Sequence, residues 1–240
     1  MALPKLNVPV YETILPSTEK VIKYRPFLVK EEKILLTALE DETGTAMAGA
    51  VKQIIGNCIQ SEIDVDNLPT FDIEYLFLRL RSKSVGEQIN IGLRPFPCPQ
   101  NEGNLCEKTT EVKINLEDIL VVKDEKHTNK IMLDDKVGVV MNYPNSSSLE
   151  NTEGDNFTIG MNLIKSSIKM IFTTEETYEK DSFTDEDLDE FIDSLNSSQF
   201  QKIREFFDTM PKLSHTVEYT CSTCGEEKKT TLEGLNSFFG

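Results

Sequence analysis

The chain has 240 residues and a hydrophobic content typical of globular proteins, but its charge is strongly acidic. Forty-one acidic residues against twenty-five basic ones give a formal net charge of −16. A surface of that charge repels phosphate groups, so we expect no nucleic-acid partner and no anionic membrane partner. The sequence also lacks the run of roughly 20 apolar residues that a membrane-spanning helix needs.

The N-terminal sequence resembles neither a secretory signal nor a regular helix. It has no basic segment followed by an apolar run, so we expect a soluble, intracellular protein. Four prolines, at positions 4, 9, 16 and 26, interrupt short runs such as VIKYRPF. Because proline fixes φ and removes a backbone donor, residues 1–29 are predicted to form an extended arm at the edge of the fold.

A helical pattern begins at residue 30. The segments KEEKILLTALE and TAMAGAVKQIIGNCIQ place apolar residues at helical spacing, and Asn67-Leu68-Pro69 is typical of a helix start. The segment FDIEYLFLRLRSK then predicts a strongly apolar helix. Residues 30–83 are therefore predicted to form a helical hairpin or a three-helix unit.

A β-rich stretch follows the helices and completes a predicted region 30–144. Its short strands are separated by polar turns and read QINIGLRPF, TEVKINL, KIMLDDK and GVVMNYP. Residues 145–156, NSSSLENTEGDN, are polar and small, and are predicted to be a linker. The last region, 157–240, is predicted to be helical and to end in a cysteine turn.

Three helices are predicted within that last region. FTIGMNLIKSSIKMIF has the pattern of a helix of about four turns, and SQFQKIREFFDTM that of a helix closed by Pro211. Between them, Thr184 and Asp187 have the spacing of a capping box that opens a helix. The acidic residues around this helix lack the glycine that a calcium loop of the EF-hand type requires at its sixth position, so they predict a solvated helix start.

The most specific local motif is Cys221-Ser-Thr-Cys224-Gly225 between two strand-like segments. In a zinc knuckle, two thiolates at this spacing bind one metal ion, and the following glycine permits the tight turn. A structural zinc needs four ligands, and the chain offers a second pair, Cys98 and Cys106. We therefore predict one structural zinc held by Cys98, Cys106, Cys221 and Cys224, in two hairpins that form a split zinc ribbon.

Other interpretations of these cysteines are unconnected thiols and redox chemistry. A thioredoxin-like C-x-x-C opens a helix, whereas this motif is followed by a turn and a strand-like run, which disfavours the redox interpretation. The fifth cysteine, Cys58, lies on a helix beside Ile54 and Ile55 and is predicted to be a core residue.

No catalytic arrangement is visible in the sequence. His127 lies in a polar run that is assigned to a surface loop, and His215 lies before a predicted strand. Neither histidine has a recognisable nucleophile partner. No phosphate-binding glycine motif occurs. The run Arg79, Arg81, Lys83 at a helix C-terminus suits the helix dipole. We therefore predict no enzymatic activity, no catalytic residue and no small-molecule substrate.

Four features together resemble one family. They are the proline-rich opening, the segments YRPFLVKEEK and DIEYLFLRLRSKSVGE, the first cysteine pair, and the C-x-x-C-G turn followed by TLEGLNSFFG. This combination resembles the baseplate hub assembly proteins of T-even-type, contractile-tailed bacteriophages.

The resemblance implies a structural or assembly role in the baseplate hub, with other phage tail or baseplate proteins as partners. It implies a location in the cytoplasm of the infected host or in the virion tail. Two alternatives stay open, a tail assembly chaperone that is not retained in the virion and a zinc-ribbon adaptor of a nucleic-acid machine. The predicted fold class is α+β, with an N-terminal arm, a helical unit, a middle rich in β-hairpins and C-terminal helices.

Overall fold

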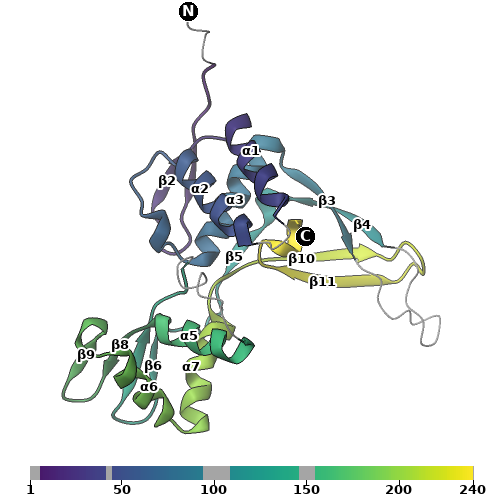
Figure 1. Cartoon of the computed structure of the whole chain (residues 1–240). Coiled ribbons are helices and arrows are strands. Elements are labelled where there is room, and N and C mark those ends of the chain that lie inside the picture. Colours follow the sequence, from purple (N-terminus) through teal and green to yellow (C-terminus); the bar gives the residue numbers. More distant parts are fainter. Residues whose placement is uncertain (1–5, 42–44, 94–108, 146–154, 240) are drawn as a thin grey trace, which may run out of the picture. The chain divides into compact units, whose positions relative to one another are not determined.

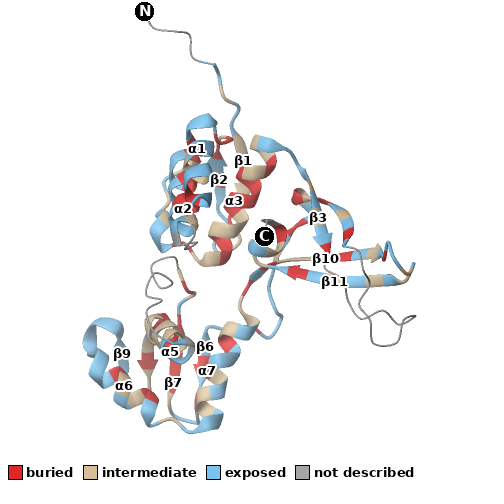
Figure 2. Ribbon diagram, turned by 45° about the vertical axis from the view of Figure 1, so that its right-hand side comes forward, coloured by how far each residue is buried: buried red, intermediate tan, exposed pale blue. Residues whose placement is uncertain are grey.

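The computed structural model describes residues 6–41, 45–93, 109–145 and 155–239. Helices and small antiparallel sheets are both present, which confirms the predicted α+β class (Figure 1). The chain divides into two compact units, each with its own buried residues (Figure 2). Unit 1 comprises Met1–Val65, Phe71–Val122 and Lys212–Gly240, and unit 2 comprises Asp66–Thr70 and Lys123–Pro211. In the described ranges, no helix is both long and apolar enough to cross a membrane.

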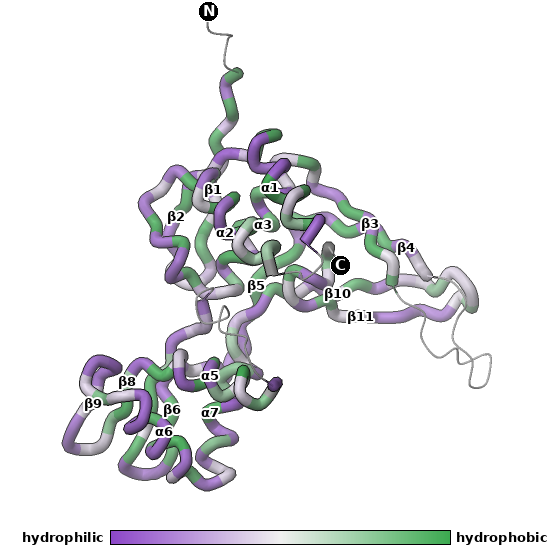
Figure 3. The backbone as a smooth tube through the Cα atoms, viewed as in Figure 1, coloured by the Kyte–Doolittle hydropathy of each residue, from purple (hydrophilic) through white to green (hydrophobic). Residues whose placement is uncertain are grey.

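About half of the predicted N-terminal arm, residues 11–24, is a β-hairpin that is packed into unit 1. Strands β1 (Tyr11–Ile14) and β2 (Val21–Tyr24) pair antiparallel. Four apolar side chains of this segment are buried: Leu15, Ile22, Tyr24 and Phe27. Before β1 the chain is extended and largely exposed, and apolar and polar residues alternate along it (Figure 3). Residues 11–28 are therefore part of the core of unit 1.

The helices of unit 1 confirm the helical prediction for residues 30–83. They are α1 (Val29–Leu39), α2 (Thr45–Cys58) and α3 (Thr70–Val85), with a short 3-10 helix η1 (Val65–Asn67) before α3. Helix α1 begins where Glu31 Oε2 accepts a hydrogen bond from the backbone N–H of Leu28 at 2.9 Å. Arg25 Nη2 donates to the other oxygen of this buried carboxylate at 2.9 Å, so the hairpin and α1 share one ion pair.

The sheets of unit 1 join its middle segment to its C-terminal segment. The strands are β3 (Gln88–Leu93), β4 (Thr110–Asn115), β5 (Leu120–Val122), β10 (Lys212–Thr220) and β11 (Glu227–Glu233). Strands β3 and β4 form a hairpin, and β5, β10 and β11 form a sheet in the order β11-β10-β5. The short helices η2 (Leu116–Asp118) and α8 (Asn236–Phe239) flank these strands. One apolar cluster links α3, both sheets and α8.

Unit 2 is a four-stranded antiparallel sheet packed with helices. The strands are β6 (Lys130–Met132), β7 (Gly138–Met141), β8 (Ile168–Phe172) and β9 (Thr177–Glu179), in that order. The helices are α5 (Asn156–Ser167), η3 (Lys180–Ser182), α6 (Asp185–Asp193) and α7 (Ser197–Thr209). A single apolar cluster joins β6, β7 and β8 to α5, α6 and α7, so these helices and strands form one core.

Two sequence predictions for unit 2 have different outcomes. The capping box at Thr184 is confirmed, because Asp187 N–H donates to Thr184 Oγ1 and Asp187 Oδ2 accepts from Thr184 N–H. The predicted four-turn helix over 157–172 is wrong in its last five residues, because the helix ends at Ser167. Residues 168–172 form β8, which lies between β7 and β9 and pairs with both. These two pairings satisfy backbone groups that a longer helix would have bonded internally.

His127 was assigned to a surface loop; it lies in the loop between β5 and β6, as predicted, but its side chain is buried, so the predicted exposure is wrong. Its side chain is buried in unit 2, where the ring stacks on Tyr143 and packs against Phe206. Its Nδ1 and Nε2 lie 3.0 Å from Thr209 Oγ1 and Tyr143 Oη, respectively. Burial, followed by the charge of Lys123, lowers the pKa of His127. The side chain is thus a neutral, hydrogen-bonded core residue.

Candidate functional site

The C-x-x-C-G motif forms the turn between β10 and β11, so it has a strand on each side, as predicted. The backbone N–H of Cys221 donates to Glu226 O at 2.8 Å, and that of Gly225 donates to Cys221 O at 2.9 Å. Gly225 has φ 73°, a left-handed conformation that favours glycine. Cys221 is buried and Cys224 is half-buried. Both cysteines therefore lie in the turn at the same end of the β10–β11 hairpin.

The other predicted ligands, Cys98 and Cys106, lie outside the described residues. The strands on either side of them are described, and Leu93 at the end of β3 is the register partner of Thr110 at the start of β4. Thr110 Oγ1 accepts a hydrogen bond from the backbone N–H of Ser222 at 3.1 Å and lies 3.2 Å from Ser222 Oγ. The loop-connected end of the β3–β4 hairpin, where β3 ends and β4 begins, therefore contacts the cysteine turn directly.

The described cysteines and histidines do not provide an alternative ligand set near this turn. His215 pairs with Leu232 in the β10–β11 register, six residues before Cys221. At about 3.4 Å per residue that separation is roughly 20 Å, so His215 does not substitute for a missing ligand. Across the described ranges, no three His, Cys, Asp or Glu side chains gather closely enough to hold a metal ion.

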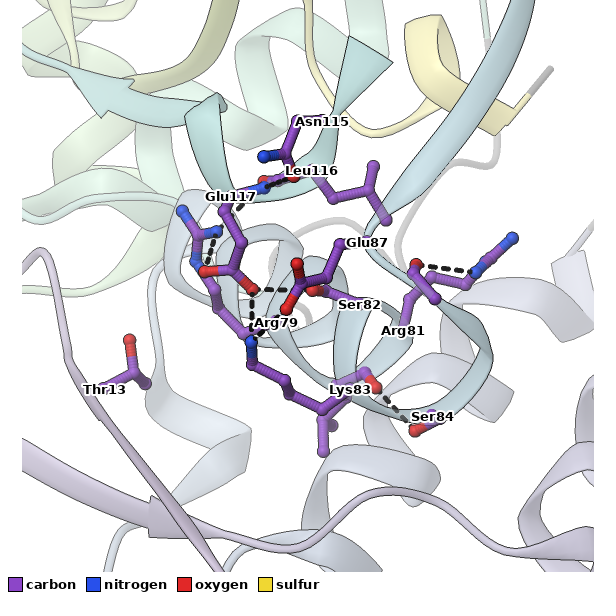
Figure 4. Close-up of polar contacts among 12 residues, drawn as sticks. Thr13, Arg79, Arg81, Ser82, Lys83, Ser84, Glu87, Asn115, Leu116 and Glu117 are labelled. Carbon is purple, nitrogen blue, oxygen red and sulfur yellow. Dashed lines mark hydrogen bonds and ion pairs between the residues drawn. The ribbon is translucent and has the colours of Figure 1, made fainter. Parts of the chain in front are cut away.

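A second polar site connects α3 to η2 in unit 1, and sequence reasoning assigned its residues only to the end of a helix. Arg79 is 4% exposed, and its guanidinium donates to Leu116 O at 3.0 Å and to Glu117 Oε2 at 3.0 Å (Figure 4). It also donates to Ile119 O at 2.7 Å. This fork geometry is the one for which arginine is suited. The guanidinium carbon of Arg79 also lies over the Tyr75 ring, 4.7 Å from the ring centroid.

Glu117 is the centre of this α3 ion-pair network. Its Oε1 accepts from Ser82 Oγ at 2.6 Å and lies 3.2 Å from Lys83 Nζ, which also contacts Glu87 at 2.6 Å. Burial alone would raise the pKa of Glu117, but the bond from Ser82 and the charges of Arg79 and Lys83 outweigh it, so the pKa is lowered. The carboxylate is therefore held ionised by its neighbours and is unsuited to act as a proton donor.

The chemistry of this network is that of a structural tie. Each hydrogen bond of the Arg79 guanidinium that is described above has its acceptor in another segment of the same unit. Sequence reasoning missed the burial of Arg79, because arginine is usually exposed. The local sign of its burial is its position among apolar residues of a helix, in LFLRLR. The network fixes η2 and β5 against α3.

Comparison with protein families identifies a match over most of the chain. The family model described as T4 bacteriophage base plate protein matches residues 8–240. Searches of curated proteins and of solved structures found no match. The family match spans both compact units and includes the β1–β2 hairpin, the α3 network and the cysteine turn. The chain therefore belongs to the family of T4-type bacteriophage baseplate proteins.

Proposed function

We propose that the protein is a structural or assembly component of the baseplate hub and that it acts through contacts with other baseplate proteins. The observation that carries the proposal is the family match over residues 8–240. The local chemistry supports it, because the buried polar groups at α3 and at His127 are hydrogen-bonded to other residues of the same unit. We propose accordingly that the protein has no enzymatic activity and binds no small-molecule substrate, nucleic acid or membrane.

Depletion of the protein during infection tests the assembly role. Without the chain, we expect tails whose baseplates lack a hub, and we expect expression of the wild-type chain in trans to restore them. Electron microscopy of purified tail intermediates is the readout. Complete hubs formed without the protein would contradict the proposal.

The charge around the cysteine turn disfavours the alternative of a nucleic-acid adaptor. Lys229 Nζ lies 3.0 Å from Glu218 Oε1, and Lys228 Nζ lies 3.9 Å from Glu226 Oε1. Both lysines are therefore compensated by carboxylates, whereas phosphate binding needs an uncompensated basic face. The other alternative is an assembly chaperone that is not retained in the virion. Identifying the proteins in finished particles would separate it from the main proposal, because a chaperone would be absent from them.

We also propose the zinc site predicted from the sequence, with Cys98, Cys106, Cys221 and Cys224 as ligands. Its support is the contact between Thr110 and Ser222, which joins the β3–β4 hairpin to the cysteine turn. Cys98 follows Leu93 by five residues and Cys106 precedes Thr110 by four. Segments of that length span up to roughly 13–18 Å, so both thiolates have sufficient reach to complete a tetrahedral site. Unconnected thiols would be the outcome if purified protein contained no metal.

Truncation of the N-terminus separates docking from folding. The chain before β1 has Leu6 90% exposed and Val10 49% exposed, and an extended apolar segment of this kind suits strand addition to a partner sheet. Deleting residues 2–9 is expected to reduce co-purification with baseplate proteins while thermal unfolding changes little. Deleting residues 2–28 is expected to unfold unit 1, because Leu15, Ile22, Tyr24 and Phe27 leave its core. Normal incorporation of the shorter truncation would show that this segment is not a docking element.

A further inference from the structure

A fully buried carboxyl group in the first turn of α3 has no cation beside it. Asp72 is 0% exposed, as is Glu31 in α1, but Glu31 is paired with Arg25. Asp72 makes no ion pair with any described residue, and its partner is Ser17 in the turn of the β1–β2 hairpin, whose N–H donates to Asp72 Oδ1 at 3.1 Å. Burying an unpaired charge is costly, so a carboxyl group in this place favours its neutral form.

The position of Asp72 in its helix explains why it bonds the hairpin. Asp72 is the third residue of α3, the position that Glu31 has in α1 and Asp187 has in α6. In those two helices the carboxylate accepts from the backbone N–H of the residue before the helix, at 2.9 Å and 2.8 Å. The residue before α3 is Pro69, which has no N–H. The Asp72 carboxyl group therefore lacks this local bond and accepts from a distant segment instead.

Two further polar atoms lie buried at this contact. Asp72 Oδ2 and Ser17 Oγ both have no hydrogen-bond partner among the described residues. A protonated carboxyl group donates from one oxygen and accepts at the other, whereas a carboxylate only accepts. Either form can bond the Ser17 hydroxyl, but only the protonated form does so without burying a charge.

The charges around Asp72 do not compensate its burial. Burial, the largest cause, raises the pKa of Asp72, and the hydrogen-bonding groups of Ser17 offset only part of this effect. Four ionisable side chains lie within three residues of the contact: Glu19, Lys20, Glu74 and Tyr75. No charged side chain, from these or from any other described segment, is among the causes of the shift. The dipole of α3 favours a carboxylate in its first turn, but this effect is smaller than the cost of burying an unpaired charge.

We infer that Asp72 and Ser17 form a proton-dependent clasp between α3 and the β1–β2 hairpin, in which the protonated carboxyl group holds the turn and the carboxylate loosens it. Because the pKa of Asp72 is higher in the folded protein than in an unfolded chain, the folded protein binds more protons. The contribution of the clasp is therefore full at low pH and is lost as pH rises from the ordinary aspartate range through the raised pKa. Residues 6–10 continue directly into β1, so the clasp determines how firmly the base of this N-terminal segment is held. The inference goes beyond the proposed function and does not depend on it.

Other carboxyl groups of unit 1 require a readout that is local to the hairpin. The pKa of Glu31 is lowered by Arg25 and that of Glu117 is also lowered, so their contributions are lost as pH falls. Glu74 has a pKa raised by burial, as Asp72 has. The stability of the whole unit therefore combines both signs, whereas the amides of residues 11–24 report on the hairpin alone.

A titration of the full wild-type chain tests the protonation of Asp72 directly. Carbon-detected NMR follows the carboxyl groups of Asp72 and of Asp187, the acid at the matching position of α6, as pH is lowered. Asp72 is expected to titrate above the ordinary aspartate pKa of about 3.9. Asp187 is expected to titrate below it, because hydrogen bonds with Thr184 lower its pKa. A midpoint for Asp72 at or below the ordinary value would overturn the inference.

The variant Asp72→Asn tests what the proton does to the hairpin. Asparagine is neutral at every pH, has nearly the same shape, and can accept from Ser17 N–H while donating to Ser17 Oγ. Hydrogen exchange of residues 11–24 is measured for the variant and the wild type between about pH 4 and pH 8, and the ratio of their protection at each pH cancels the intrinsic exchange rate. This ratio is expected to increase with pH, because only the wild type acquires a buried charge.

Asp187→Asn is the matched control for the exchange measurement. It removes a carboxylate at the same helix position in unit 2, so the ratio for residues 11–24 should not change with pH. For Asp72→Asn, a ratio that is constant or decreases as pH rises would overturn the inference. If Asp72→Asn does not fold, the wild-type titration alone decides between the two outcomes.

Discussion

Replacing Arg79 with alanine is expected to lower the free energy of unfolding by about 3–5 kcal/mol, because two buried carbonyl groups lose a charged donor at about 1–3 kcal/mol each and a cavity is left. The guanidinium bonds the carbonyl oxygens of Leu116 and Ile119, two residues with 0% exposure, and one carboxylate oxygen of Glu117. Alanine leaves both carbonyls without their charged donor and leaves a cavity beside α3. Glu117 is partly exposed, so the carbonyls account for most of the loss.

Urea unfolding monitored by circular dichroism measures this effect. Arg79→Lys should be intermediate, because an ammonium group lacks the planar fork that reaches three acceptors. Arg204→Ala is the matched control, since Arg204 is an exposed arginine on a helix of unit 2. If Arg79→Ala unfolds within about 0.5 kcal/mol of the wild type, the network contributes no more than an ordinary surface residue.

Cys221→Ser is expected to release the proposed zinc ion and to destabilise both hairpins at once. Structural zinc contributes about 10–16 kcal/mol of apparent binding free energy in zinc-finger peptides, so a loss on the order of 5 kcal/mol or more is expected here. Because isolated two-stranded hairpins are marginal in water, amides of β3 and β4 should exchange faster as well as those of β10 and β11. Elemental analysis and hydrogen exchange measure the two effects.

Cys58→Ala is the control for the zinc measurement. Cys58 is fully buried in α2, and burial raises the pKa of its thiol to about 11, so it does not supply a thiolate near neutral pH. Its replacement should lower stability through lost packing while the zinc content stays near one per chain. Wild-type protein that is folded without metal, and as heat-stable without metal as with zinc, would contradict the zinc proposal.

Local patterns in the sequence predicted most secondary structure, because those patterns coincide with what each segment buries. The apolar spacing of residues 30–83 predicted α1, α2 and α3, and the short Val- and Ile-rich runs predicted β3, β4, β6 and β7. The capping box at Thr184 was predictable because its two hydrogen bonds join residues only three apart. These are features for which local chemistry alone is sufficient.

Features that depend on distant residues were not predictable in the same way. Residues 168–172 have a helix-compatible pattern, and only the pairing with β7 and β9 makes them a strand. His127 lies in a polar run, yet Tyr143 and Thr209, 16 and 82 residues away, bury its ring and satisfy both nitrogens. Likewise, unit 1 includes residues 212–240 because β10 pairs with β5, a return that no local composition signals.

The candidate site also combines a local feature that was predictable with contacts between distant residues that were not. The turn at Cys221 to Gly225, with strands on both sides, was predictable from the cysteine spacing and from the glycine. The contact of Thr110 with Ser222, 112 residues apart, was not, and it is this contact that supports the pairing of the two cysteine hairpins. The α3 ion-pair network was also invisible, because its acceptors on η2 and its donor on α3 are 37 to 40 residues apart.

Quantitative mass spectrometry of purified tail baseplates tests the central claim most directly. If the protein is a structural component of the baseplate hub, its peptides should be present in a fixed ratio to those of other hub proteins, through repeated purification and in mature virions. The ratio should fall to background in particles assembled without the chain. A protein abundant in infected cells but absent from purified baseplates and virions would contradict a structural role and favour a chaperone that leaves before assembly is complete.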